Sequence, residues 1–172
     1  MFVSHDLDEA LKIGNTIAIM EGGRIVQAGA PEAIVTTPAT DYVRNFVANV
    51  NPLNVLKLGT MMRPTEAIAQ NGGGLQLDPR IRLGARLDAA GRAVEVDGAG
   101  LPLRVVRTIE PFVDGKVPCD WLLATGPDTP MREAIEAMRN SGWPVLIVDE
   151  NDRMLGYVGI DELLLALRRR RN

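Results

Sequence analysis

Two short apolar runs near the end of the sequence constrain its fold most. Residues 144–149, Pro-Val-Leu-Ile-Val-Asp, are apolar without alternation, which is typical of a buried strand. Glu150-Asn151-Asp152 predicts a turn, and residues 154–158 predict another strand. Two consecutive strands are therefore expected here, the first of them buried.

Helical signals lie on both sides of these strands. Thr129-Pro130 predicts a helix start, with a hydroxyl cap and a proline at the first helical position, and Ser141-Gly142 ends that helix. Asp161 opens a second helix, which runs through residues 163–167 into four arginines, Arg168–Arg171. The apolar stripe of the first helix consists of Met131, Ala134, Ile135 and Met138. The order helix-strand-strand-helix predicts an α/β (α+β) fold.

The first fifty residues predict short helices around one hairpin. A helix is expected from Asp6, whose side chain can cap it, to about Ile13. Gly22-Gly23 predicts the turn between two strands. The other expected elements are strands over 17–20 and 24–27, a helix over 32–35, and a helix over 41–50 with Tyr42, Val43, Phe46, Val47 and Val50 on one face.

The middle of the chain predicts mainly strands. They are expected within 80–87, 92–96 and 101–109, and a short helix is expected over 65–70. Three consecutive glycines, 72–74, predict a flexible loop. This part therefore differs from the helix-strand alternation at the end of the chain.

Composition excludes several classes of function. A net charge of −3 argues against bulk nucleic-acid binding, and 4% aromatic residues leave no platform for stacked bases. No apolar run approaches the roughly 18–20 residues that cross a bilayer, and the start lacks the pattern of a signal peptide. The lone Cys119 excludes an internal disulfide and suggests no metal cluster. We expect a cytoplasmic protein, and a soluble subunit docked on a membrane protein has the same composition.

The start of the chain carries a motif followed by a helix and a hairpin. The motif, Phe2-Val3-Ser4-His5-Asp6, with these elements resembles the end of the ATPase domain of ABC transporters. In that family a switch histidine faces the γ-phosphate of ATP, so the resemblance implies this role for His5 in a complete ATPase. The sequence contains no Gly-x-x-x-x-Gly-Lys-Ser/Thr loop and no Leu-Ser-Gly-Gly-Gln-type signature. We therefore expect no ATP hydrolysis by this chain alone; the alternative is that it is a truncated form of a full transport ATPase.

The end of the chain resembles a CBS domain, a module that occurs in pairs and often binds adenosine nucleotides. Importer ATPases for osmoprotectants (glycine betaine, proline or choline) carry CBS domains after the ATPase domain, and residues 8–15, 41–47 and 51–56 resemble that family. Three segments are expected. They are an ATPase remnant (1–50), a degenerate, β-rich CBS-like module (51–124) and a CBS motif with an arginine-rich tail (125–172).

The CBS resemblance implies a nucleotide cleft. The residues expected to line it are Thr125, Thr129, Pro144, Val145 and Asp161, with ATP, ADP or AMP as the ligand or with no ligand at all. The ribose-binding carboxylate is either Asp161 or Glu162, and Asp161 is also placed to cap its helix. Gly159 stands where the family has a hydroxyl.

The resemblances also imply partners. CBS pairing implies a homodimer, and the parent protein would contact the membrane subunits of an importer at the inner face of the cell membrane. Arg168–Arg171 either attract anionic lipid, with a dependence on ionic strength, or form a solvated helix end. The first forty residues are expected to order only against an oligomer partner or the CBS module; the alternative is folding onto the chain's own C-terminal half.

Overall fold

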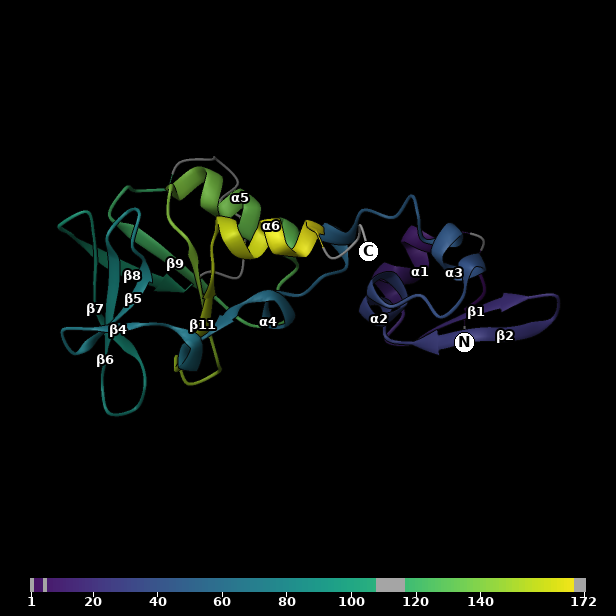
Figure 1. The fold of residues 1–172 in the computed structure, drawn as a ribbon, viewed down its shortest axis with the longest axis horizontal. Helices are drawn as coiled ribbons and strands as arrows, with labels where there is room; N and C mark the ends of the chain where they lie inside the picture. Colours follow the sequence, from purple (N-terminus) through teal and green to yellow (C-terminus); the bar gives the residue numbers. More distant parts are fainter. Residues whose placement is uncertain (1, 5, 108–116, 169–172) are drawn as a thin grey trace. The chain divides into compact units, whose positions relative to one another are not determined.

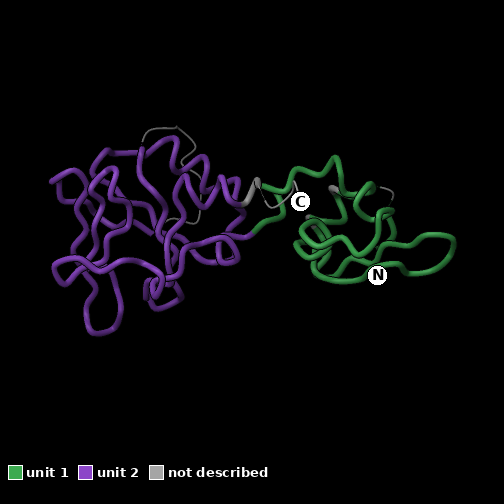
Figure 2. Tube along the Cα trace, viewed as in Figure 1, with its two compact units in different colours: residues 1–56, 167–172 green, residues 57–166 purple. Residues whose placement is uncertain are grey.

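The computed structural model describes residues 2–4, 6–107 and 117–168. The chain divides into two compact units, one formed by Met1–Leu56 with Leu167–Asn172 and the other by Lys57–Ala166 (Figure 2). No helix in the described parts is both long and apolar enough to span a bilayer.

The first unit contains the helices and the hairpin that the sequence predicts. Asp6 caps the first helix by accepting a hydrogen bond from the Glu9 amide (3.1 Å), and Gly22 and Gly23 turn the hairpin with φ of +56° and +77°. Its elements are α1 (Leu7–Ile13), β1 (Ile17–Glu21), β2 (Arg24–Gly29), α2 (Pro31–Thr36), α3 (Asp41–Phe46) and the 3-10 turn η1 (Pro52–Asn54).

The first unit has an apolar core of its own. The buried members are Leu11, Ile17, Ile19, Ile34, Val43, Val47 and Val50. This core contradicts the expectation that the first forty residues order only against a partner or the CBS module. The predicted helix over 41–50 ends at Phe46, and its predicted single face is also wrong, because Tyr42 and Phe46 stack on each other while remaining 37% and 43% exposed.

The second unit is built on one nine-stranded sheet within the described residues (Figure 1). The strand order is β3-β11-β10-β9-β8-β7-β6-β5-β4; β9 runs parallel to β8 and to β10, and the other pairs are antiparallel. Its elements are α4 (Leu58–Met61), β3 (Arg63–Pro64), the 3-10 turn η2 (Thr65–Ala67), β4 (Gln70–Asn71), β5 (Gly74–Asp78), β6 (Leu83–Leu87), β7 (Ala93–Gly98), β8 (Leu101–Arg107), β9 (Trp121–Thr125), α5 (Met131–Ser141), β10 (Val145–Val148), β11 (Met154–Val158) and α6 (Ile160–Arg168). The predicted α+β class is confirmed.

The two edge strands of this sheet come from one short stretch of chain. β3 ends at Pro64 and β4 begins at Gln70, so the connection spans at most about 22 Å. Nine strands spaced by about 4.8 Å would hold the edges of a flat sheet about 38 Å apart. The sheet must therefore curl until its edges approach each other.

The β-rich part joins the C-terminal strands without a break. Arg104 to Arg107 of β8 pair with Trp121 to Ala124 of β9, so the predicted segment boundary between residues 124 and 125 falls inside a strand. From β4 to β8 the chain is an antiparallel succession of strands, without the helix-strand-strand-helix order that a CBS module has.

Two local predictions in the second unit are wrong. The helix expected over 65–70 is only the short turn η2, because the chain then enters β4, and Gly72 and Gly73 (φ +58° and +82°) turn the β4–β5 hairpin. The hydroxyl of Thr129 does not cap α5: it lies 2.8 Å from that of Thr125, while Pro130 occupies the cap position without a side-chain hydrogen bond.

A close backbone contact joins β3 to β11. Gly156 of β11 pairs with Pro64, and a Cβ atom at this glycine would lie 2.3 Å from the carbonyl oxygen of Arg63. Any side chain here would force the two strands apart. The contact therefore requires glycine.

We predict that Gly156→Ala lowers the free energy of unfolding by about 2–3 kcal/mol, because the added methyl group overlaps backbone that cannot move aside cheaply. Gly126→Ala is the matched control, since a Cβ there meets no atom within 4 Å, and it should change stability by less than about 0.5 kcal/mol. Urea denaturation measures both. Equal stability of the two variants would contradict the close contact.

Candidate functional site

The candidate site lies where β11 ends and α6 begins. The backbone N–H of Gly159 donates a hydrogen bond to Oε2 of Glu162 (3.0 Å), so a carboxylate three residues into the helix reaches back to its start. Glu162 is only 4% exposed. The prediction that Asp161 caps this helix is wrong, because the helix begins at Ile160, so that Asp161 is its second residue and Gly159 occupies the cap position.

A guanidinium neutralises the buried carboxylate. Nη2 of Arg63, in β3, lies 2.8 Å from Oε1 of Glu162, so the two oxygens of this carboxylate have different partners. The Arg63 guanidinium also lies over the ring of Tyr157, 5.6 Å from its centre. Burial, and then the charge of Glu162, raise the pKa of the Tyr157 phenol. The Glu162 carboxylate is therefore buried and fully paired, while the Arg63 side chain remains 39% exposed.

A second arginine holds the neighbouring carboxylate. Nη1 and Nη2 of Arg80 each lie 3.1 Å from an oxygen of Asp161, and the same guanidinium contacts Asp78 through Nε (3.1 Å) and Nη2 (2.8 Å). The hydrogen bond from Arg80 lowers the pKa of Asp78, and Asp78 in turn raises the pKa of Arg80. Arg80 therefore bridges the β5 end of the β-rich part and the start of α6.

The other predicted cleft residues fall into two groups. Pro144 and Val145 are buried, Val145 pairs with Val158, and the ring of Pro144 would lie 3.7 Å from a Cβ at Gly159. Thr125 lies farther along the sheet, paired with Ile147, and is bonded to Thr129 as described above. The structure thus brings Pro144 and Val145 to the start of α6, and Thr125 and Thr129 to each other.

Arg63 and Arg80 are functional residues that local sequence patterns do not predict. Neither belongs to a motif, and Arg80 is 81 residues from Asp161 along the chain. The one available signal was the pair Asp161-Glu162 at the start of an apolar helix, because a buried carboxylate needs a cation. His5, the predicted switch histidine, lies outside the described residues.

Comparison with known proteins identifies the class of module and its relatives. Residues 122–169 match the family model of the CBS domain. The chain is 33% identical over 98% of its length to the glycine betaine/proline betaine transport system ATP-binding protein ProV of Escherichia coli K12, and covers 44% of that protein. It is 31% identical over 97% of its length to the glycine betaine transport ATP-binding protein OpuAA of Bacillus subtilis, covering 41% of it. A 66-residue match, 38% of this chain and 19% of the relative, is 47% identical to the trimethylamine N-oxide transport system ATP-binding protein TmoW of Pelagibacter ubique.

These matches confirm the resemblance inferred from the sequence. Residues 122–169 are similar to the CBS domain, and the chain is similar over almost all of its length to ATP-binding proteins of glycine betaine transport systems. It spans about two fifths of the length of those relatives.

We predict that Glu162→Gln lowers the free energy of unfolding by about 2–3 kcal/mol, because it removes the charge that pairs with Arg63 in a desolvated place. Glu95→Gln, in the exposed Arg86–Glu95 pair, should leave stability nearly unchanged. Chemical denaturation compares the two. If Glu162→Gln costs no more than Glu95→Gln, the Arg63–Glu162 pair does not stabilise the fold.

Acid should weaken the second unit through Asp78. Its folded-state pKa lies below the model-compound value of 3.8, so its contribution to stability is present above that pH and is lost as pH falls through the folded pKa. Asp78→Asn and Arg80→Met should both reduce the loss of unfolding free energy in this acid range, since each removes one side of the interaction. Urea denaturation at a series of pH values, from neutral to below pH 3.8, measures the free energy of unfolding of each variant. If the loss of stability in acid is the same in both variants as in the original chain, the Asp78–Arg80 interaction is not its source.

Proposed function

We propose that this chain is the regulatory CBS-type region of an importer ATPase for quaternary amines or other osmoprotectants, such as glycine betaine, proline or choline. The observation that carries the proposal is the CBS match over residues 122–169 within a chain similar to ATP-binding proteins of glycine betaine transport. The region senses adenine nucleotide or ionic strength. By itself it does not hydrolyse ATP.

The proposed nucleotide site contains Thr125, Thr129, Pro144, Val145 and Asp161. Its ligand is ATP, ADP or AMP, bound where two such modules meet. The side chain of Arg80 is 55% exposed and that of Asp161 is 49% exposed, so their ion pair is held by little burial and can open at small cost. Asp161 would then bind the ribose hydroxyls, and Arg80 would face the phosphate.

His5 is proposed as a catalytic residue only in a complete ATPase, where its imidazole would donate a hydrogen bond to the γ-phosphate. His5 would have this role under the alternative hypothesis, in which the chain is part of a full ATPase that couples ATP hydrolysis to import. The similarity to ATP-binding proteins over 98% of the chain supports that parent protein.

The proposed partners are a second copy of the chain and the membrane subunits of the importer, at the cytoplasmic face of the cell membrane. On α6, Ile160, Leu164 and Leu165 are each about half exposed, which offers an apolar face to a second CBS module. Arg168–Arg171 are proposed to contact anionic lipid with a strength that falls as salt rises, and Arg169–Arg171 lie outside the described residues.

A ligand-free structural or dimerisation module is the second candidate. One observation favours it: Asp161 and Glu162, the two carboxylates available for ribose, are both already paired with arginines. Gly159 also lacks the hydroxyl that the family uses there.

Isothermal titration of the chain with ATP, ADP and AMP separates the two candidates. We expect saturable binding of at least one nucleotide, weakened about tenfold by Asp161→Asn because a charged hydrogen-bond partner is lost. Asp120→Asn, an exposed aspartate outside the site, is the control and should bind as the original chain does. Flat titrations with all three nucleotides would support the ligand-free module instead.

A further inference from the structure

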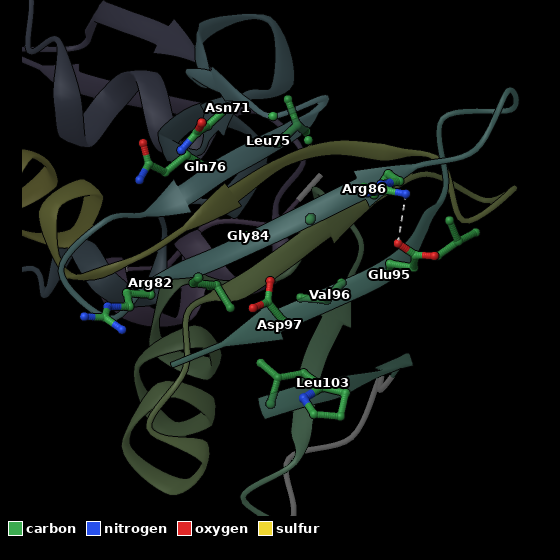
Figure 3. Close-up of a pocket in the computed structure, with 16 residues that line it drawn as sticks. Asn71, Leu75, Gln76, Arg82, Gly84, Arg86, Glu95, Val96, Asp97 and Leu103 are labelled. Atoms are coloured by element: carbon green, nitrogen blue, oxygen red, sulfur yellow. Dashed lines mark ion pairs between the residues drawn. The ribbon is translucent and has the colours of Figure 1, made fainter. Parts of the chain in front are cut away.

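A groove of about 700 Å³ lies on one face of the β-rich part of the second unit. It crosses the strands from β4 to β8 and is lined by both polar side chains and glycines (Figure 3). Lining residues used below are Asn71, Gln76, Arg82, Gly84, Asp97 and Pro102. None of them belongs to the site at the start of α6.

The strand register explains why the sheet is hollowed here. Gly84 of β6 pairs with Gln76 on β5 and with Asp97 on β7, and Asp97 pairs with Pro102 on β8. Directly paired residues project from the same face, so these four form a row across the sheet. A Cβ at Gly84 would lie 3.4 Å from Oδ1 of Asp97, which places that carboxylate beside the glycine. The glycine therefore forms the floor, between an amide and a carboxylate.

Arg82 and Asp97 bring two opposite charges to this groove, and both side chains are exposed to solvent. Arg86 and Glu95 pair with each other (3.3 Å). Among the described residues, by contrast, the side chains of Arg82 and Asp97 take part in no hydrogen bond or ion pair. Arg82 also holds a left-handed backbone (φ +50°), which is unusual for a long side chain and persists only where the surrounding structure imposes it.

We propose that this groove binds a small zwitterionic solute, with its carboxylate on Arg82 and its ammonium group on Asp97. A ligand with only a negative charge would leave Asp97 unpaired beside it, and one with only a positive charge would leave Arg82 unpaired. The amides of Asn71 and Gln76 supply further donors and acceptors for the body of the ligand. Since the groove is open and none of the described residues that line it is aromatic, binding is weak, with a dissociation constant on the order of a millimolar. The site therefore responds only to an abundant solute.

Amide NMR spectra of the isotope-labelled chain, titrated at constant ionic strength, test the proposal. The ligands are glycine, β-alanine, γ-aminobutyrate and ε-aminocaproate, whose charges are progressively farther apart; butyrate and butylammonium carry one charge each. We expect saturable shifts confined to residues near β5–β7, strongest for one member of the series, with binding at least about tenfold weaker for both single-charge ligands. Absence of saturable shifts for every zwitterion, or equal binding of butyrate, butylammonium and the best zwitterion, overturns the proposal.

Variants then assign the two charges. Asp97→Asn should bind butyrate as well as it binds the zwitterion, and Arg82→Gln should do the same for butylammonium, because each keeps one charged contact. Arg132→Ala, an exposed arginine on α5, should bind the zwitterion as the original chain does. Loss of affinity in Arg132→Ala equal to that in Arg82→Gln would mean that general surface charge, and not the groove, attracts the ligand. The spectra of the free variants report whether each one is folded.

Discussion

The buried carboxylate of Glu162 is the constraint on which the second unit depends. A carboxylate that is 4% exposed is costly unless its charge is paired and its oxygens accept hydrogen bonds. Here the N–H of Gly159 satisfies one oxygen and fixes where α6 begins, while Arg63 neutralises the charge and holds β3 beside β11. The same carboxylate therefore fixes a helix start and an edge of the sheet.

The elements that could be predicted from the sequence are those specified by neighbouring residues. The Asp6 cap, the Gly22-Gly23 hairpin and the strands after Pro144 follow from turn residues and local apolar patterns, and the structure contains them. The CBS resemblance at the end of the chain could also be recognised from the sequence, because it rests on local patterns of helices, strands and turns.

The wrong predictions in the second unit lie where residues far apart in the sequence determine the local structure. Thr65 to Gln70 has a helical pattern, but Gln70 is drawn into pairing with Leu75 and becomes an edge strand. The hydroxyl of Thr129 was assigned to its own helix, yet the hydroxyl of Thr125 on β9 lies within reach. The pairing of Arg63 with Glu162 and that of Arg80 with Asp161 join residues about eighty or more positions apart, a distance at which no local pattern carries information.

The curled sheet has a consequence for how the second unit forms. β3 and β4 are the first two strands of the sheet along the chain, and they form its two opposite edges. Each of these edge strands is only two residues long. So little edge is left that a strand from another molecule has almost no template for pairing. Arg63, however, pairs with Tyr157, about ninety residues later. On the ribosome, one edge must therefore wait for nearly the whole unit to be synthesised, and contacts this distant in sequence make folding slow.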